Sequence, residues 1–208
     1  MITQLSVEKL LDDLASAAPT PGGGSAAAIM GAMGAALISM VCNVTLGKKG
    51  QEAAAAEMQA VRAESEKLRA RLTAMVADDV AAFDGLMAAY RLPKATEDEK
   101  LCRAEAIQHS LRSATETPLD CARACAEVIA LSQRAAEHGF AGVISDAGVG
   151  VLAANTALRS AALNVYINVP SLKDRAFADQ ALAEMEQMQQ TSAQITESVF
   201  SRVRGRLG

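Results

Sequence analysis

Apolar residues recur every three or four positions along most of the chain, which is the spacing of one face of an α-helix. One clear run places residues at this spacing: Leu68, Leu72, Met75, Asp79, Phe83 and Leu86. The period-two alternation of β-branched and aromatic residues that is typical of strands is nearly absent. The pattern therefore predicts an all-α fold.

Glycine and proline residues divide this pattern into six or seven helices around one core, so we expect a single helical bundle domain over residues 1–208. The expected helices cover residues 6–17, 26–46, 52–89, 96–114, 118–139 and 146–165, and a last one opens after residue 171. The first helix is expected to turn three leucines inward: Leu10, Leu11 and Leu14. Pro118 suits the first position of its helix, where a missing N–H is harmless. Ser171 with Asp174 resembles a capping box that opens the last helix.

The segment of residues 26–46 is the most apolar part of the chain, and no charged residue occurs between Asp13 and Lys48. It is long enough to span a bilayer. Its many alanines and glycines make transfer into lipid weakly favourable, however, and we expect no second segment to pair with it. We therefore predict a central buried helix and no membrane partner. Small residues recur on one face, where another helix or a second copy of the chain could approach closely: Ala27, Gly31, Ala35 and Ser39.

The composition of the chain bears on its binding partners and on how its interior is packed. The 208 residues include 20 Lys and Arg against 24 Asp and Glu, which gives a net charge of −4. This balance argues against nucleic-acid binding, which normally needs a basic surface. Apolar residues make up 50% of the chain, aromatic residues only 3%, and alanine occurs 44 times. Such an interior favours closely packed helices.

The cysteines and histidines do not form a metal-binding pattern. No secretory leader is recognisable before the cysteines, so we expect reduced thiols in a cytoplasmic protein. Cys121 and Cys125 share a helix face without a C-x-x-C motif, and burial as small apolar residues is their expected role. The only histidines are His109 and His138, and Glu105 with His109 lacks the E-x-x-H spacing of di-iron bundles. We predict no metal site.

Two carboxylates fall at otherwise apolar positions. Asp79 lies on the inward stripe of its predicted helix, whereas Asp78 points outward. Asp146 opens a helix, where free N–H groups favour a negative charge, and it lies within the apolar run V-I-S-D-A-G-V-G-V. A carboxylate in such surroundings must be paired, hydrogen-bonded or neutralised. The residues alone leave open whether each acid has a structural role or lines a functional cleft.

A glycine turn is the third feature that could form part of a functional site. Residues 19–25 read P-T-P-G-G-G-S, and three glycines before a helix indicate a sharp bend or a close approach. Ser25 could cap the helix, and the free N–H groups could bind an anion. Gly47 and Lys48 do not form a Walker loop, since the earlier glycine is missing and Lys49 replaces the Ser or Thr. No strand precedes the glycines, which excludes a dinucleotide fingerprint.

Five motifs together carry a resemblance to a known family. They are P-T-P-G-G-G-S (19–25), N-V-T-L-G-K-K (43–49), D-D-V-A-A-F (78–83), I-S-D-A-G-V (144–149) and N-V-Y-I-N (164–168). In this order, over nearly the whole chain, they resemble the formiminotransferase-cyclodeaminase C-terminal domain family. One departure lies before the S-D motif, where G-N is expected and the chain has Gly139 and Phe140, followed by Ala141 and Gly142.

The resemblance implies an all-helical homodimer that binds a reduced folate and uses neither a metal nor a cofactor. It implies hydrolysis of 5,10-methenyltetrahydrofolate to 10-formyltetrahydrofolate, with Asp146 as the orienting or general-base carboxylate. Lys48 would be the proton donor or hydrogen-bond partner, and Asp79 would bind the pterin ring or orient another group. Residues expected to position the folate are Pro21, Gly22, Gly23, Gly24, Ser25, Asn43, Ser145 and Asn164. Lys49 and Arg159 are available for its glutamate carboxylates.

Two alternatives remain open from the residues. A formiminotetrahydrofolate cyclodeaminase would pass through a similar ring adduct that carries an amino group and releases ammonia. The sequence has no attached formiminotransferase domain to deliver a formimino substrate, which favours the cyclohydrolase. A non-catalytic helical module, dimerising through the small-residue stripe, would instead have no affinity for folate.

Overall fold

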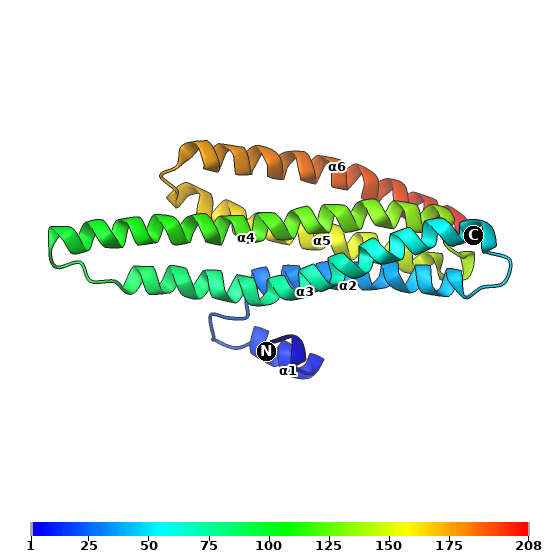
Figure 1. The fold of residues 1–208 in the computed structure, drawn as a ribbon, viewed down its shortest axis with the longest axis horizontal. Coiled ribbons are helices and arrows are strands. Elements are labelled where there is room, and N and C mark those ends of the chain that lie inside the picture. Colours follow the sequence, from blue (N-terminus) through cyan, green and yellow to red (C-terminus); the bar gives the residue numbers. More distant parts are fainter. Residues whose placement is uncertain (1, 208) are drawn as a thin grey trace.

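Helix α2 (Gly23–Leu46) lies at the centre of an all-helical bundle, packed against α3 (Ala55–Arg91), α4 (Glu97–His138) and α5 (Ile144–Asn168) (Figure 1). The computed structural model describes residues 2–207, and it contains no strand within that range. Four short 3₁₀ helices accompany the α-helices: η1 (Ile2–Gln4), η2 (Glu52–Ala54), η3 (Ala141–Val143) and η4 (Val169–Ser171). The predicted all-α fold is confirmed.

Helices α3 and α4 form a long hairpin, which extends beyond the amino-terminal end of α2 (Figure 1). Helix α5 returns antiparallel to α4 along α2, and α6 (Arg175–Leu207) covers α4 and α5. Residues far apart in sequence thereby meet around the first turn of α2, which faces the middle of the α3–α4 hairpin.

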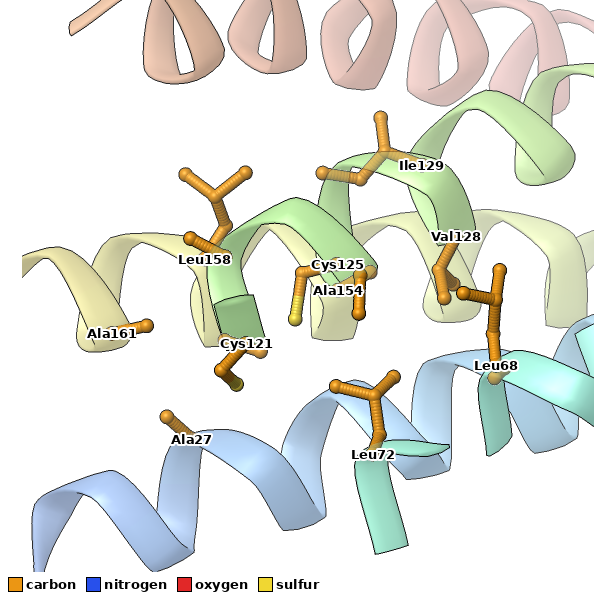
Figure 2. Close-up of a cluster of buried hydrophobic side chains, with 14 of the residues drawn as sticks. Ala27, Leu68, Leu72, Cys121, Cys125, Val128, Ile129, Ala154, Leu158 and Ala161 are labelled. Carbon is orange, nitrogen blue, oxygen red and sulfur yellow. The ribbon is translucent and has the colours of Figure 1, made fainter. Parts of the chain in front are cut away.

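The small-residue stripe of α2 packs inside the chain itself. A Cβ on Gly31 would lie 2.8 Å from the Cys125 Sγ atom of α4 and 3.1 Å from a methyl carbon of Leu72 on α3. Ser39 and Ser65 share a buried hydrogen bond of 2.8 Å. Figure 2 shows Ala27, Leu72, Cys121 and Cys125 converging at this crossing. Close approach of neighbouring helices, one of the two predicted uses of the stripe, is confirmed.

Two stretches are long and apolar enough to cross a membrane by length and composition alone: α2 and Ala141–Ser171, which contains α5. The expectation that only one segment qualifies was therefore wrong. In the bundle, 56% of the apolar window of α2 is buried against other helices, and 44% of the second window. Burial in the core accounts for most of the hydropathy of α2, but part of α5 stays exposed.

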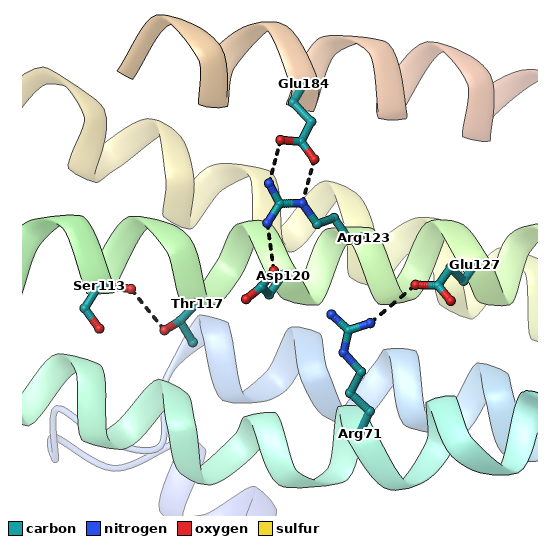
Figure 3. Close-up of polar contacts among 7 residues, drawn as sticks. All are labelled: Arg71, Ser113, Thr117, Asp120, Arg123, Glu127 and Glu184. Carbon is teal, nitrogen blue, oxygen red and sulfur yellow. Dashed lines mark hydrogen bonds and ion pairs between the residues drawn. The ribbon is translucent and has the colours of Figure 1, made fainter. Parts of the chain in front are cut away.

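Pro118 lies inside α4 and does not open a new helix, so the two helices expected over residues 96–139 are one. Proline removes one intrahelical hydrogen bond and usually breaks a helix. Here one side chain of α5, Asn168, supplies the missing donor, and a threonine hydroxyl makes a further bond beside the proline. Thr117 donates from its hydroxyl to the Ser113 carbonyl at 3.0 Å (Figure 3). The Asn168 Nδ2 atom of α5 donates to the Ala114 carbonyl at 2.8 Å.

The first helix, α1 (Val7–Leu14), has no buried residue and lies outside the bundle (Figure 1). Leu11 is 58% exposed, and Leu10 and Leu14 are only half-buried. The prediction that these leucines face the core was wrong, since the segment of residues 15–22 carries α1 away from the other helices.

Two helix starts also differ from the predictions. Helix α2 begins at Gly23, so two of the three glycines lie in its first turn and not in a loop. Helix α6 begins at Arg175, and the Phe177 N–H group donates to the Asp174 Oδ1 atom at 3.0 Å. Asp174 caps this helix without Ser171, which belongs to η4, so the expected capping box is absent.

Candidate active site

The Asp79 carboxylate of α3 lies against the first turn of α2. Its Oδ2 atom accepts a hydrogen bond of 2.7 Å from the buried Ser25 hydroxyl. A Cβ on Gly24 would overlap the carboxylate and lie 2.7 Å from its carboxyl carbon. Gly22 precedes α2 without any side-chain cap, so the negative charge of Asp79 lies near the positive end of the α2 dipole. The glycine run therefore permits the close approach of Asp79.

This contact changes the interpretation of the glycine turn. The sequence indicated that the free N–H groups at the start of α2 could bind an anion, and a carboxylate of the chain itself lies there. Ser25 is the hydrogen-bond partner of Asp79 and not the N-cap of α2. A second anion placed beside Asp79 would be repelled. The Asp79 end of α2 is better suited to N–H donors or to a cation.

A cavity of about 10 Å³ lies beside Asp79, which is room for about one water molecule. Its lining comes from four helices: Gly24, Ala28, Met75, Asp79, Thr117, Pro118, Cys121 and Ala161. A pterin ring is far larger than this cavity. Such a ligand therefore reaches the half-buried Asp79 only from its solvent-exposed side.

Lys48 and Asp146 lie at the opposite end of α2. The Lys48 Nζ atom lies 4.7 Å from the centre of the Phe140 ring, a cation–π distance. The Phe140 N–H group donates to the Thr45 Oγ1 atom at 2.9 Å, which holds the loop before α5 against α2. Asp146 is half-buried in the first turn of α5. Lys48 and Lys49 are exposed just beyond the carboxyl end of α2, where the dipole favours cations.

Asp79 cannot meet Lys48 and Asp146 at one substrate within a single chain. Helix α2 has 24 residues, so its ends lie about 35 Å apart. Asp79 of α3 contacts the first turn of this helix, and Lys48 follows its last turn. One chain thus brings Lys48 and Asp146 to one end of α2 and places Asp79 at the other.

The other predicted site residues divide between the same ends. Asn164 joins the Asp79 end, because a Cβ on Gly23 would lie 3.9 Å from its Nδ2 atom. Pro21 is buried just before the glycines. At the Lys48 end, Asn43 accepts a hydrogen bond of 3.3 Å from Arg62, and Ser145 is exposed.

Arg159 is the one predicted residue that belongs to neither end. It lines a surface hollow of about 300 Å³ with residues of α5 and α6. The buried Oδ1 atom of Asn155, which also lines this hollow, has no hydrogen-bond partner among residues 2–207.

Helices α2 and α5 both expose large apolar side chains along their lengths, and these side chains together are here called the α2–α5 face. Its large exposed side chains are Met33, Met40, Val44, Val149, Leu152, Leu163 and Ile167. Residues three or four positions apart share a helix face. Asp146 therefore continues the stripe of Val149, and Lys48 lies just beyond the carboxyl end of α2. The polar candidates therefore lie near the two ends of the helices that carry this face.

The cysteines behave mostly as expected. Cys121 and Cys125 are buried as predicted, Cys42 is also buried, and Cys102 is exposed. Burial raises the pKa of Cys42 to about 11. The hydrogen bond with Cys121, and then burial, raise the pKa of the Cys125 thiol. Within residues 2–207, no three His, Cys, Asp or Glu side chains are grouped as metal ligands.

Comparison with known proteins places the chain in a family. Residues 6–187 match the model of the family described as formiminotransferase-cyclodeaminase. The chain belongs to the formiminotransferase-cyclodeaminase family. Its six-helix fold is shared with formiminotetrahydrofolate cyclodeaminase from Thermotoga maritima, with a TM-score of 0.89, 28% identity and complete coverage of both chains.

Two relatives within this family differ in length. The chain is 54% identical to a methenyltetrahydrofolate cyclohydrolase from Methylorubrum extorquens over 97% of both proteins. It is 34% identical to the formimidoyltransferase-cyclodeaminase of Sus scrofa over 93% of this chain, which corresponds to 36% of the pig protein.

Sequence reasoning missed Phe140 as the contact of Lys48, and it missed the wall that Thr117 and Pro118 form beside Asp79. Buried positions follow one another at helical spacing straight through the proline: Leu111, Thr115, Pro118, Ala122, Cys125 and Ile129. This continuous spacing is a signal that could have identified α4 as one helix.

Proposed function

We propose that this chain is a methenyltetrahydrofolate cyclohydrolase, which converts 5,10-methenyltetrahydrofolate to 10-formyltetrahydrofolate. The observation that carries the proposal is 54% identity over 97% of both chains with the Methylorubrum extorquens cyclohydrolase. The candidate site supports it, because the carboxylates of Asp146 and Asp79 suit a cationic substrate and Lys48 can donate a proton to the leaving nitrogen. A cytoplasmic location stays a prediction.

The reaction needs few protein groups. The methenyl carbon bridges two nitrogens of a delocalised cation and is already electrophilic. Water adds to this carbon and loses a proton to a base. The adduct then breaks one carbon–nitrogen bond, the released nitrogen takes up a proton, and the formyl group stays on the other nitrogen. Only protein interactions that strengthen in the transition state increase the rate.

The proposed roles follow from position. Asp146 orients the water or accepts its proton, and Lys48, held over the Phe140 ring, donates to the leaving nitrogen. Asp79 has a polar partner in Ser25 and solvent on one side, so it binds N–H donors of the pterin ring. Asn164 lies beside it for the same ligand.

A homodimer would unite these groups. The α2–α5 face exposes seven large apolar side chains, which is typical of an interaction surface. A two-fold axis across the middle of this face, with the α2 helices antiparallel, would bring the Lys48 end of one copy to the Asp79 end of the other. We therefore propose two composite sites per dimer.

The decisive experiment follows loss of methenyl absorbance in the presence of a chelator. We expect turnover by the unmodified protein, and at least about a hundredfold loss of kcat in separate Asp146→Asn and Lys48→Met variants. Lys49→Met is the matched control, because it removes a neighbouring exposed charge and should keep kcat. Unchanged kcat in a folded Asp146→Asn or Lys48→Met protein would remove that residue from the mechanism.

Cyclodeaminase activity is the second candidate, favoured by the fold shared with the Thermotoga maritima enzyme. The same preparation should be given formiminotetrahydrofolate and ammonia should be measured. Release of ammonia faster than hydrolysis of the methenyl compound would replace the cyclohydrolase assignment. Failure to bind a stable folate analogue would favour a non-catalytic module.

A further inference from the structure

The proline inside α4 leaves one backbone carbonyl without its usual partner. In an α-helix the N–H of residue 118 would bond to the carbonyl of residue 114, and Pro118 has no N–H. The Asn168 Nδ2 group fills this gap, at 2.8 Å from the Ala114 oxygen. Its second hydrogen goes to the Asn164 carbonyl at 3.0 Å. Both amide hydrogens of a half-buried side chain are therefore used.

The segment held in this way forms a wall of the candidate site. Thr117 and Pro118 face Asp79 across the cavity of about 10 Å³. Because that cavity has no spare room, a small shift of α4 moves the wall against the carboxylate or away from it. Asn164, which accepts the other hydrogen bond through its carbonyl, has its own amide near Gly23. Asn168 thus connects α4 to the end of α5 beside Asp79.

We propose that Asn168 is a positioning residue for folate binding, which stands in for the missing N–H of Pro118 and thereby fixes the α4 wall around Asp79. This inference rests on the proposed function of that site. It assigns a role to the last residue of N-V-Y-I-N, which the sequence interpretation left without one.

The test is a double-mutant cycle on methenyltetrahydrofolate hydrolysis. Asn168→Leu keeps the size of the side chain and removes both donors, and should raise KM about tenfold through misplacement of Asp79, with kcat changed less than about twofold. Pro118→Ala restores the backbone donor for Ala114. The double variant Pro118→Ala/Asn168→Leu should therefore have the KM of Pro118→Ala alone, within about twofold.

A matched control separates positioning from general stability. Gln108 also connects α4 to η4, donating to the Ser171 carbonyl at 3.0 Å and accepting from the Lys173 N–H at 2.7 Å, but it is absent from the lining of the Asp79 cavity. Gln108→Leu should lower Tm and leave KM unchanged. If Asn168→Leu does not fold, Asn168→Ser, whose hydroxyl is too short to reach Ala114, takes its place.

Three results would overturn the inference. The first is an unchanged KM in the Asn168 variant, and the second is an equal rise of KM in Gln108→Leu. The third is a KM of the double variant that stays above that of Pro118→Ala alone. Inactivity of the unmodified protein would instead reject the proposed function, and the two failures are therefore distinguishable.

Discussion

Gly24 and Asp79 are the pair of residues on which the Asp79 end of the site depends. Replacing Gly24 by Ala puts a methyl group where the carboxylate lies, so either α2 shifts or Asp79 loses its bond to Ser25. We expect KM to rise at least about tenfold and the free energy of unfolding to fall by about 2 kcal/mol. Steady-state kinetics and urea unfolding measure the two effects.

Gly85 provides the control for this substitution. It also lies in a helix, but a Cβ there would meet no atom within 4 Å. Gly85→Ala should therefore stabilise the protein by about 0.5–1 kcal/mol, because alanine loses less chain entropy in a helix. A Gly24→Ala protein with normal KM and unchanged stability would show that Asp79 does not need this close approach.

Single residues could be predicted only in part. The inward position of Asp79 and the unusual cost of three glycines are both visible in the sequence. The sequence does not show that Asp79 and the glycines contact each other, because Ser25 and Asp79 are 54 positions apart. Helical spacing relates only neighbours on one helix. For the same reason the contact of Lys48 with Phe140 had no local signal.

At the level of helices, Arg123 connects α4 to α6 through an ion pair. It donates to both carboxylate oxygens of Glu184 at 2.6 Å, and to Asp120 at 2.7 Å (Figure 3). The hydrogen bond from Arg123 lowers the pKa of Glu184 from its ordinary 4.5. Both side chains are about a third exposed, so solvent weakens the pair, and we expect Glu184→Gln to cost about 1 kcal/mol of unfolding free energy at pH 7.

The pH dependence of this loss has a definite sign. Since the pKa of Glu184 is lower in the folded than in the unfolded chain, its contribution is fully present above pH 4.5 and disappears as the pH falls through the lowered value. Urea unfolding of both proteins at pH 7 and pH 3 measures it. Glu186→Gln is the control, at an exposed position of α6 without an ion pair among residues 2–207. It should leave the free energy of unfolding unchanged at both pH values. A cost that persists at pH 3 would mean that Glu184 acts by packing.

At the level of elements, the helices were predicted well and their ends less well. Apolar spacing located every long helix, because each buries one face. The break at Pro118 was wrong because a proline's effect depends on whether another element supplies the missing donor, here Asn168 from α5. Likewise, α1 has the spacing of a buried helix, yet no surface of the bundle covers it.

At the level of the whole molecule, the site motifs fall at opposite ends of α2, which no local pattern reveals. The sequence indicated candidate site residues, but an antiparallel bundle decides which of them are neighbours. The exposed α2–α5 face is the physical reason to add a second copy, since it runs from Lys48 and Asp146 at one end to Asn164 at the other.

Mixing two defective proteins tests this arrangement. If one copy supplies Lys48 and Asp146 and the other supplies Asp79, an Asp79→Asn chain paired with an Asp146→Asn chain forms one site with all three groups intact. Random reassociation of equal amounts makes half of the dimers mixed, and one of their two sites is whole, so about a quarter of the unmodified activity should return.

Activity after unfolding and joint refolding, compared with each variant refolded alone, measures this recovery. Sedimentation of the refolded protein supplies the control, because recovery requires dimers. If dimers form and no activity returns, each site lies within one chain. Asp79 would then belong to a separate binding surface about 35 Å from the residues that carry the reaction.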